Sequence, residues 1–298
     1  MAVTAATPTT PPALPAGACD CHTHVIGPRD QYPMVQDRHY TPGPATVDDL
    51  EAHLARHGLE RVVIVQPSFY GTDNSCTLDA LDQLGGGVGR AVAVVADDVD
   101  DAALHAMHRR GVRGLRLNVE SGGIRDASLV GQTLQRWSHK VAHLGWHLQV
   151  FASFDTISGA AEEFARLEVP VVLDHFALVP VAMDVADPRA QPLLELLRGG
   201  NAWLKLSAPY RLDGGGETLQ DRVDAWAAAF IAAAPQRMLW GSDWPHTNRE
   251  AGKGPLEVSA YRELGDGVLD GGIRRWLPTA ALRQQVLVDN PERLYGWY

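Results

Sequence analysis

The segment CDCHTH, which begins at Cys19, places an aspartate, two cysteines and two histidines within six positions. These residue types can bind a metal ion, form a redox pair or line an active site. Side chains of an extended strand alternate between two faces, so Asp20, His22 and His24 are expected on one face. Cys19 and Cys21 are expected on the other face, packed behind the strand as small buried hydrophobic groups. Alternation therefore argues against a four-ligand zinc site and predicts that the two histidines belong to a site completed elsewhere in the chain.

Other polar residues that could complete this site end the β-rich segments of the sequence. Asp174 and His175 lie near the end of PVVLDHF, and Asp243 ends RMLWGSD. An aspartate can take a proton from water, while imidazoles can polarise a carbonyl group or bind a divalent metal. Arginines bind carboxylates through a bidentate fork. The remaining polar residues at or just after segment ends are Gln66, Ser68, Arg116, Asn118, Lys205, Ser207, Tyr210, Arg211, Ser242, His246 and Asn248.

Eight β-rich segments could bring these residues to one rim. They span residues 18–24, 61–68, 90–97, 111–118, 146–153, 170–176, 202–208 and 237–243. Amphipathic windows such as TVDDLEAHLARHG and DDAALHAMHRRG separate them, with apolar residues at helical spacing and capping residues at their ends. Eight alternating βα units predict a (β/α)₈ TIM barrel, whose active site lies at the carboxyl ends of the strands. An open doubly wound sheet is disfavoured because no glycine-rich dinucleotide loop follows the first segment.

The domain organisation is expected to be simple. Residues 1–17, rich in Pro, Thr and Ala, predict a flexible N-terminal arm, and residues 18–298 predict one barrel domain with extra helices after about Gly252. The arm has neither a basic region nor an apolar region, so it does not resemble a secretory signal. The three cysteines are too few for a disulfide framework, which favours reduced thiols and a cytoplasmic location.

Charge and hydropathy exclude some classes of partner. The net charge of −10 argues against binding to nucleic acid or to an anionic membrane surface, both of which need a basic footprint. An anionic small molecule stays compatible with this charge, because local arginines decide its binding. The sequence contains no run of about 18 apolar residues, so no membrane span is predicted.

Two features allow a structural interpretation in place of a functional one. His53 and His57 are spaced as a metal pair would be, but they fall on the first predicted helix and are interpreted as a solvated helix face. Lys205 falls within a predicted barrel strand, where it could serve as an ion-pair partner or as a catalyst. The residue pattern leaves both roles of Lys205 open.

Three motifs taken together resemble the amidohydrolase superfamily: DCHTH on the first strand, DH on the sixth and WGSDWPHTN on the eighth. The segments VIVQPSFYGTDN, GVRGLRLN, WLKLSAPYRLD and NPERLY are similar to its branch of 2-pyrone-4,6-dicarboxylate lactonases and 4-sulfomuconolactone hydrolases. The resemblance extends from about Gly17 to the end of the chain. It implies a TIM-barrel hydrolase that opens a carboxylate-bearing lactone with an aspartate-activated water.

The resemblance also implies roles for particular residues. Asp243 matches the general base, and His22, His24 and His175 match the histidines around the lactone carbonyl. Residues matching positions that bind substrate carboxylates, or that complete the pocket, are Tyr40, Ser68, Arg116, Arg211, His246 and Asn248.

Three positions depart from the pattern of the pyrone dicarboxylate enzymes. Gly122 stands where a second arginine is expected, with Arg125 nearby as a replacement. Phe151 replaces a tyrosine, and Leu178 replaces an arginine. Neither glycine nor leucine can hold a carboxylate as arginine does. We therefore expect an acidic lactone with fewer, or differently placed, acidic groups than a planar dicarboxylate.

The cofactor prediction favours no obligatory metal, because the sequence lacks the bridging lysine and additional histidine of a binuclear centre. If a metal is present, a single divalent cation such as zinc is expected on His22, His24, His175 and Asp243. Two other functions stay open at this point. One is a metal-dependent decarboxylase of an aromatic or unsaturated acid on the same barrel, and the other is a non-catalytic small-molecule binder.

Overall fold

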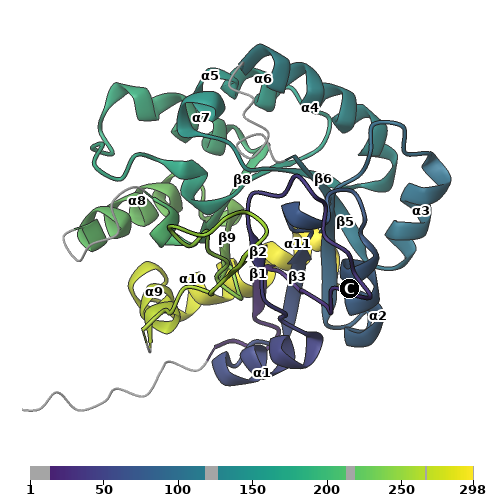
Figure 1. Ribbon diagram of the computed structural model, residues 1–298. Helices are drawn as coiled ribbons and strands as arrows, with labels where there is room; N and C mark the ends of the chain where they lie inside the picture. The colour runs from purple at the N-terminus through teal and green to yellow at the C-terminus, as the bar shows by residue number, and fades with distance from the viewer. Residues whose placement is uncertain (1–13, 118–126, 213–218, 266, 298) are drawn as a thin grey trace, which may run out of the picture.

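The computed structural model describes residues 14–117, 127–212, 219–265 and 267–297, and its centre is a parallel barrel (Figure 1). Its strands are β1 (Cys19–Thr23), β3 (Arg61–Val65), β4 (Gly89–Ala93), β5 (Val112–Leu117), β6 (His147–Val150), β7 (Val171–Leu173), β8 (Ala202–Ser207) and β9 (Met238–Gly241). They form one eight-stranded sheet in this order, and every neighbouring pair is parallel. All eight predicted strands are thus confirmed, and so is the (β/α)₈ barrel.

The barrel closes where the ends of β1 and β9 meet. Backbone hydrogen bonds run from His24 N to Trp244 O (2.8 Å) and from Asp243 N to His22 O (2.9 Å). The strands approach so closely that a Cβ added at Gly241 would lie 2.7 Å from His22 Cβ. Glycine is therefore required at this position. The two segments that carry the catalytic residues predicted on β1 and β9 are joined directly by this seam.

Helices surround the barrel and alternate with its strands along the chain. They are α1 (Val47–His57), α2 (Ser75–Leu84), α3 (Asp101–Arg109), α4 (Ala127–Val141), α5 (Phe154–Gly159), α6 (Ala161–Ala165), α7 (Gln191–Gly199), α8 (Gln220–Ala233), α9 (Val268–Trp276), α10 (Ala280–Gln284) and α11 (Asn290–Tyr295). Helix α1 shows how sequence sets the ends: Thr46 and Asp49 form a capping box, and Gly58 ends the helix with φ +66°. The extra helices predicted after Gly252 are α9, α10 and α11 (Figure 1). None of the helices in the described ranges is long and apolar enough to cross a membrane.

The barrel interior is closed at its amino-terminal end by the last residues of the chain. Leu294, Tyr295 and Trp297 pack with inward side chains of the strands, among them Val63 and Trp203. Arg90 at the start of β4 fastens this end, since its guanidinium donates to the carbonyl oxygens of residues 295 and 296. Solvent is thereby excluded below the strands, and the opposite rim is left for a site.

Strand β1 carries a bulge that overturns the predicted alternation of its side chains. Asp20 pairs with Val62 but Thr23 pairs with Ile64, so β1 holds one more residue than β3 over this stretch. An extra residue re-aims the side chains that follow it. The bulge therefore lets the histidines that follow it share the inner face with Cys19 and Cys21, which lie inside the barrel, packed with Val63 and Val65, and not behind the wall as predicted.

Asp20, which precedes the bulge, faces outward, and this corrects its predicted place beside the histidines. Its Oδ1 accepts from the backbone N–H groups of His22 (3.1 Å) and Ser242 (2.9 Å). Its Oδ2 lies 3.3 Å from Nε2 of His53 on α1. His53 is only 8% exposed, so its interpretation as a solvated residue was wrong. Asp20 and His53 tie the barrel seam to the first outer helix.

Of the predicted N-terminal arm, residues 1–13 lie outside the described ranges. The arm's last residues already contact the barrel: Leu14 packs against the hydrophobic core, and the backbone N–H of Gly17 donates to Glu60 Oε2 (2.8 Å).

A buried histidine makes the stability of the fold sensitive to acid. His147 is 1% exposed inside the barrel, and its ring lies 5.3 Å from that of Tyr295. Burial, together with the charge of Lys205, lowers the pKa of His147 to about 3. Below the ordinary histidine pKa of about 6.5 the unfolded chain binds a proton that the folded chain does not. The free energy of unfolding therefore decreases as the pH is lowered below this value.

We expect this histidine alone to cost about 2 kcal/mol of stability between pH 7 and pH 5. Urea unfolding gives the free energy of unfolding of the wild type and of His147→Leu at both pH values. The contribution of His147 is the difference between the two proteins in how much this free energy changes from pH 7 to pH 5. Equal pH dependence in the two proteins would contradict the assignment.

Candidate active site

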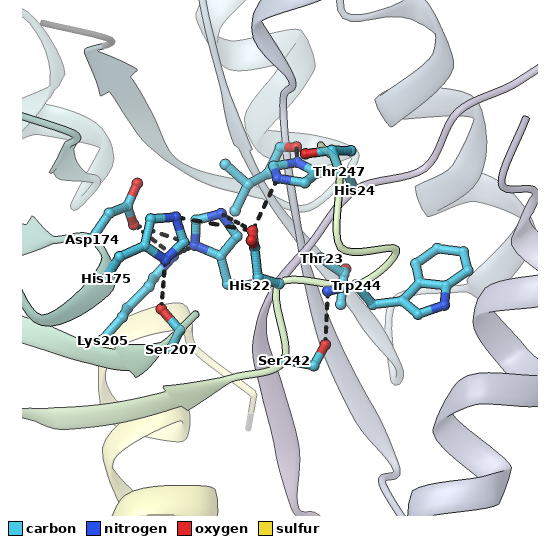
Figure 2. Close-up of polar contacts among 12 residues, drawn as sticks. His22, Thr23, His24, Asp174, His175, Lys205, Ser207, Ser242, Trp244 and Thr247 are labelled. Carbon is cyan, nitrogen blue, oxygen red and sulfur yellow. Dashed lines mark hydrogen bonds and ion pairs between the residues drawn. The ribbon is translucent and has the colours of Figure 1, made fainter. Parts of the chain in front are cut away.

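Three imidazoles surround one carboxylate oxygen at the carboxyl end of the barrel (Figure 2). The Nε2 atoms of His22, His24 and His175 lie 3.7, 3.6 and 3.9 Å from Asp243 Oδ1. The rings of His22 and His175 are 4.6 Å apart, and those of His22 and His24 are 5.1 Å apart. The residues at or just after the carboxyl ends of β1, β7 and β9 that the sequence singled out therefore meet at one point.

The other nitrogen of each ring is held by a neighbour. His24 Nδ1 lies 2.7 Å from the carbonyl oxygen of Val65, and His175 Nδ1 lies 2.8 Å from Ser207 Oγ. A carbonyl oxygen only accepts, so His24 Nδ1 carries the hydrogen and its Nε2 presents a lone pair when the ring is neutral. These partners fix the ring orientations and aim the Nε2 atoms at Asp243.

The backbone at two of these residues is in the left-handed region. Asp243 has φ +62° and His175 has φ +48°. Non-glycine residues with such angles cost about 1–3 kcal/mol each and persist where the surrounding structure imposes them. At Asp243 the constraint is the seam, since its N–H is bound to His22 O. The strain turns both side chains towards the common centre.

The second oxygen of Asp243 is bound by two residues that follow β8. Oδ2 accepts from Tyr210 Oη (2.7 Å) and from Arg211, with Nε at 2.8 Å and Nη2 at 2.7 Å. Burial alone would raise the pKa of Asp243, but the positive charge of Arg211 and the contacts with the surrounding imidazoles hold it well below its usual value. Asp243 is therefore an ionised carboxylate with one oxygen engaged and the other directed at the imidazoles.

The imidazole of His175 is neutral at physiological pH. Burial lowers the pKa of His175 to about 3, against the opposing effect of Asp243. Burial also lowers the pKa of His22 well below its usual value, and the charge of Lys205 acts in the same direction. Neutral rings can donate one hydrogen bond each or bind a cation through a lone pair.

A cavity of about 80 Å³ opens beside this centre. Of the predicted substrate-binding residues, Tyr40, Ser68, Arg116 and Arg211 line it. The full lining is His24, Tyr40, Pro67, Ser68, Arg116, Phe151, His175, Arg211, Asp243 and Thr247. His246 instead lines a neighbouring groove between α1 and α9, and Asn248 is absent from both linings. Arg125 lies outside the described residues.

Arg116 and Phe151 form one wall of the cavity. The Arg116 guanidinium lies 3.3 Å from Asp174 Oδ2 and donates to the carbonyl oxygen of Gln66 at 3.3 Å. Its Cζ lies 5.7 Å from the centre of the Phe151 ring. These contacts hold a positive charge at the cavity wall, opposite a carboxylate that is already neutralised by Arg211.

Four polar residues of the site received no specific role from the resemblance, although Asp174 and Tyr210 were among the polar residues expected at the strand ends. Tyr210 and Thr247 contact the groups around Asp243: Tyr210 binds Oδ2, and Thr247 Oγ1 accepts from Tyr40 Oη (3.2 Å). Gln149 and Asp174 lie below the imidazoles, where Gln149 Nε2 donates to Asp174 Oδ2 (3.0 Å). The available signal was position: Asp174, Tyr210 and Thr247 each lie next to a predicted residue, and Gln149 lies near the end of β6.

The donor set fits a single divalent cation. Ligand atoms of His22, His24 and Asp243 all lie within 4.8 Å of one another, and the same holds for His22, Asp174 and His175. His22 Nε2 and Asp243 Oδ1 are buried and have no hydrogen-bond partner in the described part of the chain. Imidazole nitrogens and carboxylate oxygens are common zinc ligands. The site can thus hold a metal, or it can hold polar atoms of a substrate and water.

The model of the amidohydrolase family matches residues 19–297. The chain belongs to the amidohydrolase family. It is 34% identical to the 4-sulfomuconolactone hydrolase of Hydrogenophaga intermedia, over 95% of this chain and 90% of that protein. It is also 34% identical to a 2-pyrone-4,6-dicarboxylate hydrolase of Comamonas testosteroni, over 95% and 91%.

Solved structures agree with this family membership. A Pseudomonas putida structure, provisionally named a 2-pyrone-4,6-dicarboxylic acid hydrolase, superposes on this chain with a TM-score of 0.79 at 31% identity. The superposition covers 95% of this chain and 98% of that one. The resemblance inferred from the motifs is thereby confirmed for this amidohydrolase.

Proposed function

We propose that this amidohydrolase hydrolyses a lactone that carries an acidic group. The observation that supports this most directly is the pairing of Asp243 with three imidazoles beside a cavity that also contains Arg116 and Arg211. Ester hydrolysis needs a base for water, polarisation of the carbonyl and stabilisation of the developing oxyanion. The relatives named as lactone hydrolases, each aligned over most of its length, give further support.

In the proposed reaction, Asp243 Oδ1 takes a proton from a water molecule whose oxygen attacks the lactone carbonyl. A neutral imidazole donates a hydrogen bond to the carbonyl oxygen as negative charge develops there. The tetrahedral intermediate then collapses, the ring C–O bond breaks, and the leaving oxygen receives the proton from Asp243. Water is added across the bond and the carboxylate is regenerated.

Asp243 has to become a stronger base when substrate is bound. In the free enzyme its Oδ2 accepts from Arg211 and Tyr210, and the charge of Arg211 lowers its pKa and its affinity for a proton. An acidic group of the substrate would compete with Oδ2 for the guanidinium of Arg211. This competition links recognition of the acid to activation of the base, and it supports an anionic lactone over a neutral one.

The lining of the cavity supports a lactone with fewer acidic groups than a dicarboxylate. Phe151 presents an aromatic ring to the cavity, and Leu178 lies on the segment after His175. Arg116 and Arg211 are the arginines among the described lining residues. We propose that one of them binds the substrate's acidic group while the apolar ring of Phe151 packs against the lactone. Tyr40 and Ser68 supply further hydrogen bonds in this proposal.

A panel of lactones tests the function. Pyrone, muconolactone and sugar-acid lactones, each in acidic and neutral forms, are incubated with the purified protein, and ring opening is followed by absorbance and acid release. We expect turnover of at least one acidic lactone. Release of carbon dioxide from an unsaturated acid without lactone turnover would support a decarboxylase instead, and binding without turnover would support a binder.

A bound divalent cation would be held by His22, His24, His175 and Asp243, and it would supply Lewis-acid polarisation of the carbonyl. We propose that no metal is obligatory, because Asp243 and the imidazoles by themselves provide a base and hydrogen bonds. Turnover is therefore expected to persist after dialysis against a chelator, with metal content measured before and after. Stoichiometric zinc combined with loss of turnover on chelation would contradict this proposal.

The cellular location is also a proposal. All three cysteines are buried and unpaired in the structure. Free thiols are typical of a reducing compartment, which supports a cytoplasmic enzyme.

A further inference from the structure

Lys205 is fully buried inside the barrel, directly below the imidazoles (Figure 2). Its Nζ donates to Gln149 Oε1 at 2.7 Å and makes a hydrogen bond with His22 Nδ1 at 3.3 Å. Asp174 Oδ1 lies 3.6 Å from Nζ and balances its charge. An ammonium group has three donors and no acceptor. The bond between Lys205 and His22 therefore requires a lone pair on His22 Nδ1.

Asp174 is the competitor for the same ring nitrogen. Its Oδ1 lies 3.3 Å from His22 Nδ1, but this oxygen has no hydrogen-bond partner among the described residues. Its Oδ2 accepts from Gln149 Nε2 (3.0 Å) and from Arg116 Nη2 (3.3 Å). The carboxylate is thus held by other partners, and the hydrogen bond at His22 Nδ1 is made with Lys205.

We infer that Lys205 is a positioning residue that holds His22 as the tautomer with its hydrogen on Nε2. The two histidines of the HTH motif then differ in what they present to the site. His22 presents an N–H, whereas His24, whose Nδ1–H is bound to Val65 O, presents a lone pair. His22 can therefore donate to a carbonyl oxygen on which charge develops, and His24 can accept from a water molecule.

The same tautomer opposes cation binding at His22. A metal ligand must offer a lone pair at the bound nitrogen, and Nε2 of His22 carries a hydrogen as long as Nδ1 accepts from Lys205. The ammonium adds a repulsive positive charge 3.3 Å from the same ring. Loss of Lys205 would let Nδ1–H donate to Asp174 Oδ1, and Nε2 would then become free to bind a cation.

Nitrogen-15 NMR of the protein labelled at its histidine nitrogens tests the tautomer directly, without substrate. His22 signals are assigned by their loss in His22→Gln. We expect a pyridine-type Nδ1 and a pyrrole-type Nε2 in the wild type, and the reverse in Lys205→Met. A pyrrole-type Nδ1 in the wild type overturns the inference, and this measurement stands even if Lys205→Met does not fold.

Kinetics and zinc titration supply two further readouts. Lys205→Met should lower kcat for the lactone by about 10²-fold, the usual effect of losing one oxyanion donor, with KM changed less than about threefold. Its zinc affinity, measured by calorimetry with zinc alone, should rise at least about tenfold. Lys253→Met is the matched control, since Lys253 pairs with Glu250 on the surface and should change neither quantity.

These outcomes separate the inference from the proposed function on which the catalytic role rests. Tighter zinc binding with an unchanged His22 tautomer would assign the effect to charge alone and overturn the inference. If no lactone is hydrolysed but the tautomer reverses in Lys205→Met, the proposed function fails while the role of Lys205 towards His22 holds.

Discussion

Asp243→Asn is expected to lower kcat for lactone hydrolysis by about 10³-fold, within the range that a general base contributes. The amide has nearly the volume of the carboxylate but cannot take a proton from water. Its carbonyl oxygen can still accept from Tyr210 and Arg211, which bind Oδ2 in the wild type. The fold should therefore persist. Ring opening under saturating substrate measures the effect, and circular dichroism with thermal unfolding checks the structure.

Asp97→Asn is the matched control, because Asp97 is an exposed aspartate whose side chain also pairs with an arginine, Arg136. It should leave kcat within about twofold, since surface changes of this kind are usually near neutral. A folded Asp243→Asn protein that keeps more than about a tenth of the wild-type rate would show that another group activates the water.

Arg211→Met is expected to change both the substrate preference and the pH dependence. It removes the guanidinium that is proposed to bind the substrate's acidic group, so kcat/KM for an acidic lactone should fall about 10²-fold or more relative to a neutral lactone. It also removes the positive charge closest to Asp243, so the pKa of that carboxyl rises. The acidic limb of kcat/KM should consequently move to higher pH, because a larger fraction of Asp243 is protonated at a given acidic pH.

Arg116→Met separates these two effects. Arg116 lines the cavity but bonds to Asp174 and not to Asp243, so its loss should weaken binding of acidic lactones without the same shift of the acidic limb. Arg136→Met is the surface control. If kcat/KM falls equally for acidic and neutral lactones in both Arg211→Met and Arg116→Met, the arginines do not anchor the acidic group.

Several features of this protein follow from the sequence alone. Apolar runs of strand length alternate with amphipathic windows, as parallel strands covered by helices require. The count of eight such units predicts the (β/α)₈ barrel. Polar residues at the ends of these runs must then meet on one rim, which is why His22, His175 and Asp243 could be grouped despite their separation. The order of the three histidine and aspartate motifs sufficed to indicate the amidohydrolase family.

Only the tertiary structure decided which way the side chains of β1 point. Strict alternation predicted Asp20 beside the histidines and the cysteines behind the wall, but one extra residue against β3 reverses both. A bulge has no reliable signal in one strand's sequence, since it is defined by the pairing with the neighbouring strand. His53 was interpreted as solvated because it falls on the first outer helix, and only the tertiary structure places it against the outward-facing Asp20.

The role of Lys205 also depended on tertiary geometry. The sequence left it as either an ion-pair partner or a catalyst, and the choice rests on distances to His22, Asp174 and Gln149, which come from three different strands or strand ends. Hydrogen-bond direction at a ring nitrogen is set by packing across the whole barrel. The sequence thus determined which residues meet at the rim, and the closed barrel decided how their protons and lone pairs are arranged.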